Sequence, residues 1–561
     1  MGEPKYLGPS SVVSFARLIY AAVPQSQGLP VAATGSLPHA APEETVVKEE
    51  LTKLPEEAEG IYFLNAYFDV WHHSYPFLDE GCFRSTLARA YQHHAAGLQT
   101  TQDLVKNGDA SLLLETAQCL LVLALGAKIL ESRFDTDFNS HRLYYTSMQR
   151  LSQLHVAKQP LHDSLRGVQT MLLLVLCGFS FPHGLNAWYL VSTIISSCLD
   201  LGLQRRQLHS TAAGQQASDP AVHLENLRGA AFWSAYSLER SLSEGKTRAS
   251  WNTMHSMFRM LLPLHEPFAK RRRTITSSGA GSTNYEPAVF SFRFDRIVAE
   301  VKLTLYRVAN FPKRFPWPTD LESWQEKVHV ACDTILNRAV ATLNGQGFQR
   351  QDQIITSLTV KYHQCLMILY RPSPAISEPS PAALQWCYNS AAEIVRIHHE
   401  MARFATLVNS WLTAHAVFTS GITLLYCIWM SSDIRNTTSM NDLAKHGSSC
   451  TMVLDKLSKT WTVAGSAKAK FESLVQLTTE NWKRGQPDAK NVRPKECPAP
   501  SSNNIVPPGD PLSFLTGMSE ADGALASLWN DPIGSDLLPD PDIFIDELGD
   551  MSSWFDLEWL T

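Results

Sequence analysis

The chain lacks closely spaced cysteines. Its ten cysteines are scattered over 561 residues, and neighbouring cysteines lie at least 21 positions apart. No C-x-x-C pair is therefore present, which excludes a redox dithiol motif and a zinc finger built from neighbouring thiols. Scattered single cysteines are typical of buried reduced thiols. We therefore expect no metal and no cofactor.

Long uninterrupted apolar runs are also lacking. The longest strongly apolar run, Met171 to Phe179, is too short to cross a bilayer. The stretch from Trp411 to Met430 is longer, but polar residues such as Thr413 and His415 interrupt it, which favours a buried helix. The first ten residues lack the apolar region of a signal peptide. We therefore expect no secretory route and no membrane partner.

The short motifs of common catalytic sites are absent as well. No H-E-x-x-H, G-x-S-x-G, Walker or dinucleotide-binding pattern occurs. Three pairs of adjacent histidines are present, but neighbours on a helix point about 100° apart and cannot easily chelate one metal ion. We therefore predict no catalytic residues, no metal ligands and a protein that is not an enzyme. A helical enzyme or ligand-binding protein, with a site assembled from scattered residues, stays the alternative.

Positive charge is missing from the last 52 residues. Residues 510–561 hold nine Asp and three Glu but no Lys or Arg, whereas the rest of the chain holds 48 basic and 42 acidic residues. Like charges keep such a segment open, so its bulky apolar side chains stay available to a partner. The mixture is typical of a transcriptional activation segment, with a solubilising tail as the alternative. We predict coactivator contacts at Phe514, Trp529, Ile543, Phe544, Ile545, Trp554, Phe555, Leu557 and Trp559.

One compact basic run lies in a Ser- and Gly-rich segment. It consists of Lys270, Arg271, Arg272 and Arg273. Four adjacent cations repel one another and stay solvated, so they could act as a nuclear import signal or contact phosphate. A solvated loop without such a role is the alternative. The acidic tail favours the import signal, since an activation segment has its use in the nucleus.

Helical periodicity fills most of the remaining chain. Apolar residues recur at three- and four-residue intervals, and few windows alternate as strands do, so we predict an all-α fold. Asp163 and Asn186 are expected to cap two helices, and Gly202 is expected to end the second in the left-handed conformation. The clearest periodic stretches are Ser111–Leu130, Phe292–Ala309, Trp324–Leu343, Asp352–Tyr370, Pro381–Phe404, Val408–Met430 and Ser448–Thr460.

These patterns divide the chain into four predicted parts. Residues 1–54 form an N-terminal start with a loop. Residues 55–485 form one large multi-helix regulatory domain, interrupted by a disordered basic loop at about 245–284. Residues 486–509 are polar and Pro-rich and are expected to form a linker. Residues 510–561 form the disordered acidic-aromatic activation segment.

Five short phrases occur in a fixed order along residues 6–480. They are Tyr6 to Ser11, Tyr67 to Phe83, Asn186 to Arg205, Arg228 to Arg240, and Leu369 to Pro372. In their residues and in their order along the chain, they resemble the middle homology region of the fungal zinc-cluster transcription factors. After Arg240 the chain departs from that family, because the usual Gly-Arg-Pro turn and aspartate-rich loop are replaced by a Met-rich stretch.

The resemblance implies a nuclear transcriptional regulator, expected to be an activator of a metabolic or secondary-metabolite gene set. Its helical domain would serve regulation and dimerisation and could sense a metabolite. The family usually binds DNA through an N-terminal module of six cysteines and two zinc ions, which this sequence lacks. Promoter contact would then need a DNA-binding partner, a homodimer or another surface of the chain. A truncated gene model of a full zinc-cluster factor, with its zinc module upstream, stays the alternative.

Overall fold

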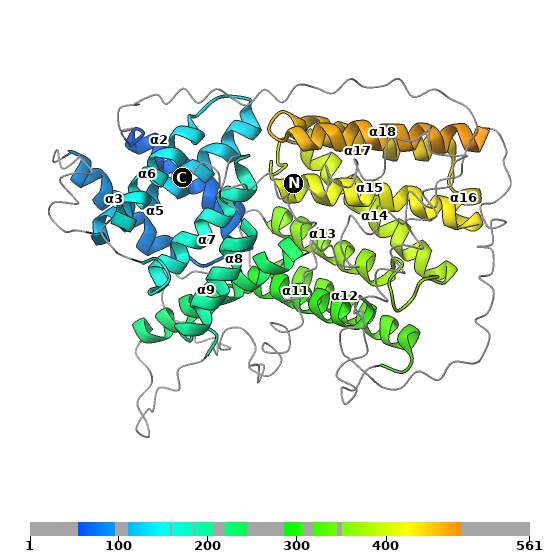
Figure 1. Ribbon diagram of the computed structural model, residues 1–561, viewed down its shortest axis with the longest axis horizontal. Helices are drawn as coiled ribbons and strands as arrows, with labels where there is room; N and C mark the ends of the chain where they lie inside the picture. Colours follow the sequence, from blue (N-terminus) through cyan, green and yellow to red (C-terminus); the bar gives the residue numbers. More distant parts are fainter. Residues whose placement is uncertain are drawn as a thin grey trace, which may run out of the picture.

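A computed structural model gives the structure of the chain. It describes residues 54–95, 110–156, 160–182, 185, 187–205, 219–243, 285–306, 318–344 and 351–483. All regular secondary structure within these ranges is helical, which confirms the predicted all-α class. The helices form two neighbouring groups, one on the left and one on the right of Figure 1.

The N-terminal group is built around one long helix. This helix, α5, packs against α2, α3, α6 and α7, while α8 lies between α7 and α9. Gly126 of α5 lies against the backbone of Phe63 in α2, where a Cβ atom would come within 1.9 Å of the Phe63 carbonyl oxygen. The elements of this group are α2 (Glu57–Tyr67), the π-helical turn η1 (Phe68–His72), α3 (Glu80–Ala95), α5 (Ala110–Phe134), α6 (Ser140–Val156), α7 (Leu165–Ser180), α8 (Ala187–Asp200) and α9 (Asp219–Ser243).

The C-terminal group is built around a second apolar helix. This helix, α15, packs against α14, α17 and α18, and α11 and α12 join the group through α13. Gly421 of α15 allows close packing, because a Cβ atom there would lie 2.8 Å from both Cys450 Sγ and the Phe471 ring. The elements are α11 (Glu286–Leu305), α12 (Leu321–Asn344), α13 (Gln351–Tyr370), α14 (Pro381–Arg403), α15 (Trp411–Met430), α16 (Ser432–Thr437), α17 (Met440–Ser458) and α18 (Thr462–Lys483).

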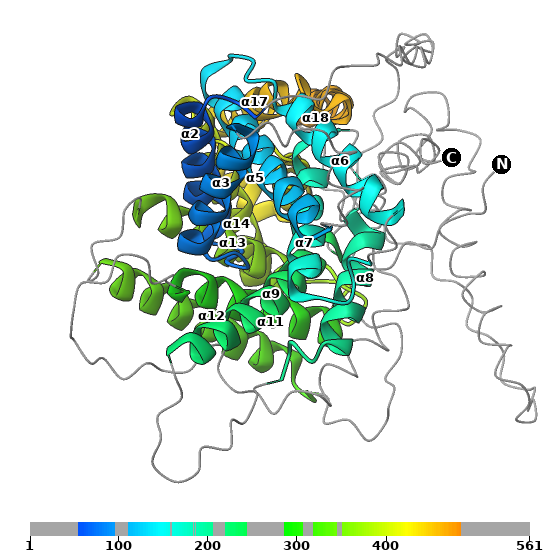
Figure 2. The same cartoon turned by 90° about the vertical axis from the view of Figure 1, so that its left-hand side faces the viewer.

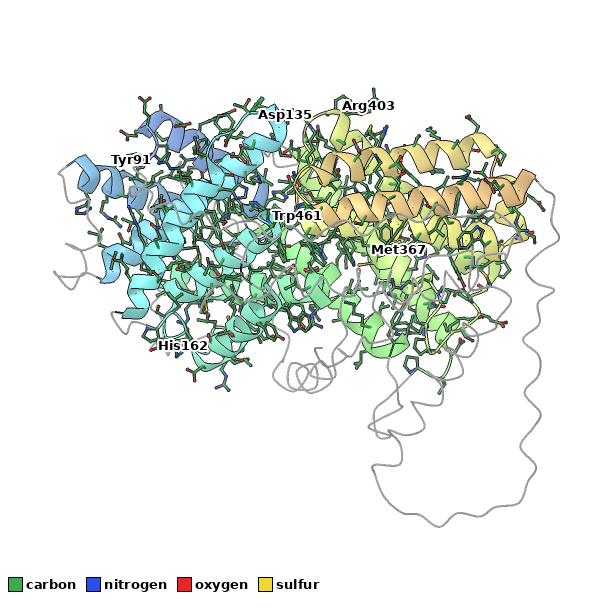
Figure 3. The ribbon with its side chains drawn as sticks, turned by 45° about the horizontal axis from the view of Figure 1, so that its top comes forward. Tyr91, Asp135, His162, Met367, Arg403 and Trp461 are labelled. Atoms are coloured by element: carbon green, nitrogen blue, oxygen red, sulfur yellow. The ribbon has the colours of Figure 1, made fainter. Side chains whose placement is uncertain are left out.

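Two described helices are long and apolar enough to cross a membrane by length and composition alone. They are Ser111–Phe134 within α5 and Trp411–Met430, and 78% and 89% of their most apolar windows are buried inside the fold. The side chains between the ribbons fill the interior of both groups (Figure 3). The prediction of a buried helix over Trp411–Met430 is therefore confirmed.

Serine residues set the starts of five helices. Ser164, Ser380, Ser410, Ser431 and Ser439 precede α7, α14, α15, α16 and α17, and each side chain accepts a hydrogen bond from the backbone N–H three residues later. Such a bond satisfies one of the free N–H groups of the first turn and typically contributes about 1 kcal/mol. The helix boundaries therefore follow local sequence chemistry.

The predicted helix caps meet different outcomes. Asp163 does not cap α7, because Ser164 stands directly before the helix and accepts from Gly167 N at 3.1 Å, while Asp163 pairs with His162. Asn186 lies outside the described residues. Gly202 has a φ of 64°, and Leu203 N donates to Cys198 O at 2.8 Å beyond it, which confirms the left-handed end of α8.

The two groups meet through α9 against α11 and α7 against α15. Figure 2 shows them from the end, with the N-terminal group nearer the viewer. A buried polar cluster lies in this junction. Lys361 Nζ of α13 donates to both carboxylate oxygens of Asp295 in α11, at 2.7 and 2.8 Å, and to Ser237 Oγ in α9 at 3.3 Å. The hydroxyl of Tyr75, beyond η1, shares hydrogen bonds with Ser237 and Ser241.

The charge of Lys361 is stabilised within this cluster. Burial lowers the pKa of an ammonium group, but the Asp295 carboxylate and its hydrogen bonds outweigh burial and raise the pKa of Lys361. The side chains of Lys361 and Asp295 are only 21% and 7% exposed. The ion pair is therefore shielded from solvent and ties α9, α11 and α13 together.

Replacing Lys361 with methionine should destabilise the fold. Methionine keeps the apolar stem but leaves Asp295 buried without its cation, so we expect a loss of about 3 kcal/mol in the free energy of unfolding. Urea denaturation followed by circular dichroism measures this loss. The control is Lys468→Met, which breaks the exposed 2.6 Å pair with Asp455 and should change stability little. Equal midpoints for Lys361→Met and the unaltered chain would show that this pair does not hold the junction.

Candidate functional site

A cavity of about 490 Å³ lies between the two groups. The N-terminal group contributes the segment from Asp69 to Tyr75 and also Arg133, near the end of α5. The C-terminal group contributes residues of α13, α14 and α15 and of the loop between the last two. Its volume falls within the range of small-molecule sites, about 300 to 1,000 Å³. We call it the junction cavity.

Helical spacing explains how distant residues line this cavity. On α13, lining residues recur every four positions at Asp352, Thr356, Val360 and Gln364, so they follow one another along one face. On α15 the lining residues are Leu412, Thr413 and Ala416, again from one face, and α14 contributes its last turns. Three helices therefore each present one stripe to the same space.

The walls are mostly apolar by area, and they also carry many polar and several charged side chains. Apolar lining residues include Val70, Trp71, Ile355, Ile397, Met401, Leu407 and Leu412. Polar lining residues include Asp69, His73, Gln364, Arg396, His398 and Glu400. Apolar walls with a small number of placed polar groups are typical of sites that bind small organic molecules.

Two neutral histidines line the junction cavity. Burial lowers the pKa of His73 to about 4, against the effect of a hydrogen bond with the Asp69 backbone. Burial also lowers the pKa of His398, whose Nδ1 lies 2.8 Å from the carbonyl oxygen of Ile394. A carbonyl only accepts, so Nδ1 of His398 carries the proton and Nε2 is left as an acceptor. Both rings therefore offer hydrogen bonds without a charge at neutral pH.

The cation of Arg396 is already engaged by two carboxylates. Its guanidinium donates to Glu393 at 2.5 and 2.8 Å and to Glu400 at 2.6 Å. The hydrogen bond with Glu393 raises the pKa of Arg396, and the same bond lowers the pKa of Glu393. This group is therefore an ion-pair network within α14, formed by side chains that are a third to a half exposed.

Hydroxyl groups at the cavity serve the local backbone. Ser410 Oγ lies 2.9 Å from Thr413 Oγ1 and caps α15 by accepting from Thr413 N. Thr413 Oγ1 also donates to Val408 O at 2.8 Å. These bonds hold the loop before α15 in place. The geometry therefore favours ligand binding between rigid walls, with no serine set beside a general base among these groups.

The residues predicted as sites from the sequence lie elsewhere. The basic run Lys270–Arg273 and all nine predicted coactivator contacts, from Phe514 to Trp559, fall outside the described residues. Their roles stay predictions, as do the four-part division of the chain and the lack of a zinc module. Sequence reasoning missed the junction cavity, because its walls come from segments as far apart as Asp69 and Ala416. On α13 the polar residues Asp352, Thr356 and Gln364 share one helical face, but such a face is equally typical of a solvent-exposed side.

Comparison with known proteins gives the fold a context. Residues 64–334 match the family described as the fungal specific transcription factor domain. The matched range begins in α2, runs through the N-terminal group and α11, and ends within α12. It therefore supplies one wall of the junction cavity, while α13, α14 and α15 lie beyond it.

Several curated fungal proteins are similar to the chain. It is 23% identical to the Pyrimidine pathway regulatory protein 1 of Saccharomyces cerevisiae over 280 residues, which cover 48% of this chain and 29% of the relative. It is 21% identical to the Positive regulator of purine utilization of Emericella nidulans over 590 residues, with 85% and 54% covered. It is 21% identical to Protein STB5 of Saccharomyces cerevisiae over 442 residues, with 74% and 56% covered.

The aligned segments thus span from less than a third to somewhat more than half of these relatives' lengths. The similarity extends past the matched domain, because the second relative covers 85% of this chain. The resemblance to fungal transcription factors, inferred from five sequence phrases, is confirmed by the family match and by the relatives. Residues 64–334 are thus similar to the fungal specific transcription factor domain, and two of the relatives are named as fungal regulators.

Proposed function

We propose that the chain is a fungal transcriptional regulator, that it acts as an activator of a metabolic or secondary-metabolite gene set, and that it is not an enzyme. The observation that carries this proposal is the transcription factor domain over residues 64–334 within an all-helical fold. The printed names of two relatives, which refer to a pyrimidine pathway and to purine utilization, support a metabolic gene set. The acidic-aromatic segment supports activation, because it has the composition that recruits coactivators.

The proposal keeps the four-part division of the chain. Residues 55–485 act as the regulatory and dimerisation domain, 486–509 as a linker and 510–561 as the activation segment. Aromatic side chains of the last part enter an apolar groove of a coactivator, and the acidic residues steer it to a basic rim. Promoter contact runs through a DNA-binding partner, through a homodimer or through a module upstream of residue 1.

The activation segment should work when it is transferred to another protein. Fusing residues 505–561 to a heterologous DNA-binding domain should activate a reporter gene. Alanine at Phe544, Trp554, Phe555 and Trp559 should lower that activation by at least about tenfold, the effect of losing about 1.4 kcal/mol of coactivator binding. Alanine at Ser519, Ser527 and Ser535 is the matched control and should leave activation unchanged. A silent parent fusion would contradict the activator proposal and favour a ligand-binding protein without a transcriptional role.

Nuclear import should depend on the basic run. A fluorescent fusion of the full chain should accumulate in the nucleus, and alanine at Lys270, Arg271, Arg272 and Arg273 should abolish this accumulation, since the import receptor binds adjacent cations. Fluorescence microscopy in a fungal host measures the distribution. Alanine at Lys327 and Arg338, two exposed cations of α12, is the control for a general loss of positive charge. Unchanged nuclear accumulation in the four-residue variant would refute this role.

We further propose that the junction cavity binds the effector of the regulatory domain. Its apolar walls and the neutral rings of His73 and His398 fit a small, largely apolar molecule with a few uncharged hydrogen-bonding groups. Such a molecule would contact both helix groups at once. Its binding would therefore favour the relative placement of the groups that best encloses it.

Filling the junction cavity should cost little stability and should impair regulation. Ala416→Phe adds a ring that the cavity can hold, so we expect a change in the free energy of unfolding below about 1 kcal/mol. Ala391→Phe, at a fully buried site of α14 away from the cavity, should destabilise by about 1 to 3 kcal/mol or more. Urea denaturation compares the two variants. The reporter output of Ala416→Phe is then compared with that of the unaltered chain under different growth conditions. If both respond in the same way, the cavity is not an effector site.

A further inference from the structure

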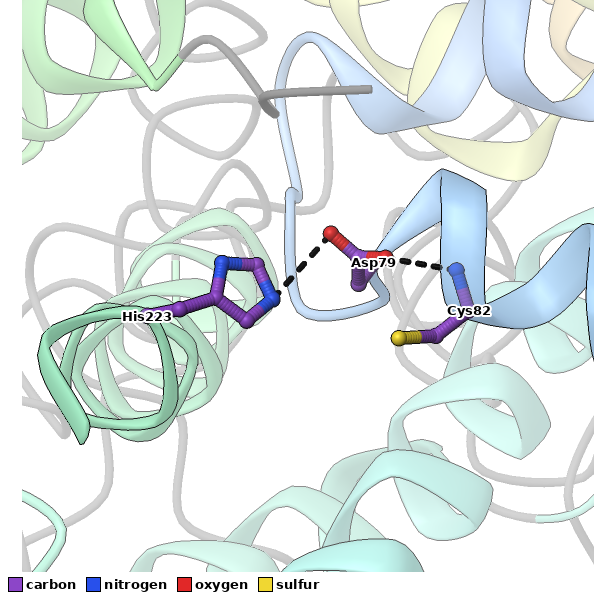
Figure 4. A group of neighbouring side chains, drawn as sticks. All are labelled: Asp79, Cys82 and His223. Atoms are coloured by element: carbon purple, nitrogen blue, oxygen red, sulfur yellow. Dashed lines mark hydrogen bonds and ion pairs between the residues drawn. The ribbon is translucent and has the colours of Figure 1, made fainter. Parts of the chain in front are cut away.

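Three side chains of different chemistry converge at the start of α3. They are Asp79, Cys82 and His223, and their candidate ligand atoms all lie within 4.8 Å of one another (Figure 4). Asp79 and Cys82 come from one turn at the N-terminus of α3, whereas His223 comes from the first turns of α9. Two elements that are separated in sequence therefore present a carboxylate, a thiol and an imidazole to one point.

Asp79 is the centre of this cluster. Its Oδ1 accepts a hydrogen bond from Cys82 N at 2.6 Å and so caps α3, while its Oδ2 lies 3.3 Å from His223 Nε2. The Asp79 side chain is 6% exposed and the His223 side chain is 41% exposed. The Asp79 carboxylate is thus buried, whereas the side chains of Cys82 and His223 are accessible to solvent.

The Cys82 thiol differs from the other cysteines. Of the nine cysteines in the described part of the chain, Cys82 is exposed and the other eight are buried. Its side chain is hydrogen-bonded to Asp79, which raises the pKa of the thiol. Asp79 has a structural role as the cap of α3, and His223 has one as its ion-pair partner. Neither role requires an exposed thiol beside the same carboxylate.

The set of donor atoms is selective among metal ions. Thiolate, imidazole and carboxylate are the ligands of zinc, with bond lengths of about 2.3, 2.0 and 2.0 to 2.2 Å, whereas calcium and magnesium prefer oxygen ligands alone. Three protein ligands with water in the fourth position is a common zinc arrangement. Separations within 4.8 Å let the three atoms close around one ion through small side-chain movements. Asp79 can bind through Oδ2 while Oδ1 keeps its bond to the helix.

We propose that Asp79, Cys82 and His223 bind a zinc ion that joins the start of α3 to α9. On binding, the Cys82 thiol releases its proton to solvent and its sulfur becomes a zinc ligand. The ion links two elements of the N-terminal group, and α9 further along carries Ser237 into the junction with the C-terminal group. The expectation of no metal ligands rested on the lack of neighbouring cysteines, and this site uses only one cysteine.

Cobalt(II) tests this proposal directly, because it replaces zinc and absorbs strongly when a thiolate binds it. The full chain, first treated with a chelator, is titrated with Co²⁺ and followed by ultraviolet and visible absorption. We expect one equivalent to produce a thiolate-to-cobalt charge-transfer band, and Zn²⁺ to abolish it by displacement. The variants Cys82→Ser and His223→Asn should lose the band or weaken it at least about tenfold, the change in affinity expected when a ligand or its support is removed.

Matched variants separate this site from other metal binding. His162→Ala removes the exposed His162–Asp163 pair, which lies 2.8 Å apart, and should leave the band intact. Cys497→Ser should also leave it intact. A band of equal intensity in Cys82→Ser would overturn the proposal. Cobalt binding that is equally strong in every variant and shows no thiolate band would overturn it as well.

A second readout is independent of absorption. Zn²⁺ should raise the thermal unfolding midpoint of the unaltered chain, since a ligand that binds only the folded state stabilises it, and a chelator should reverse this shift. The shift should be absent in Cys82→Ser and His223→Asn. Circular dichroism before metal addition checks that both variants fold, as expected for substitutions at exposed or half-exposed side chains that leave the Asp79 cap in place. Equal shifts in all variants would contradict a site at these residues.

Discussion

The buried ion pair between Lys361 and Asp295 constrains the rest of the structure. Removing two charges from water costs several kcal/mol for each ion, so the pair persists only with short distances and further hydrogen bonds. The 2.7 and 2.8 Å contacts and the Ser237 hydroxyl meet this need. Because an ion pair needs a specific geometry, it fixes the register of α13 against α9 and α11 more narrowly than apolar packing would. Val360 and Gln364, one and three residues from Lys361, line the junction cavity, so the same pair also places one cavity wall.

Under the proposal that residues 55–485 form a regulatory domain, a cavity between two packed groups is better placed for regulation than a cavity inside one group. A ligand shifts a conformational equilibrium only by as much as its affinity differs between the two states. A ligand in the junction cavity would contact Asp69 to Tyr75 of one group and α13 to α15 of the other. Its affinity would therefore depend on how the two groups are placed. Because His73 and His398 are neutral, neither ring adds a charge to the cavity. The charge of Arg396 is paired within α14 by Glu393 and Glu400.

The sequence allowed the fold class and most helices to be predicted, because amphipathic periodicity and turn chemistry are local. Gly202 illustrates this, since only a residue tolerant of a positive φ ends α8 well. The exact caps were less secure. Asp163 and Ser164 are both good cap residues, and in the structure Ser164 is the one that caps α7. The start of α17 was placed too late, because the capping box of Ser439 and Asp442 was overlooked. The junction cavity and the Asp79–Cys82–His223 cluster were out of reach, since each joins residues more than a hundred positions apart, and no local rule sets such distances.

The matched family range divides the junction cavity between two parts of the chain. Residues 64–334 supply the N-terminal group, α11 and part of α12, and with them the wall that contains Trp71 and His73. The opposite wall, from Asp352 on α13 to Ala416 on α15, lies beyond that range. The part that defines the domain therefore fixes the frame and one side of the cavity. The chemistry of the other side is set by helices beyond the matched range. Packing of α13 on α11 and α12, together with the Lys361–Asp295 pair, holds these helices against the frame. Under the proposal that the junction cavity binds an effector, substitutions on α13 to α15 alter ligand preference without disturbing the N-terminal group, provided that they leave this ion pair in place.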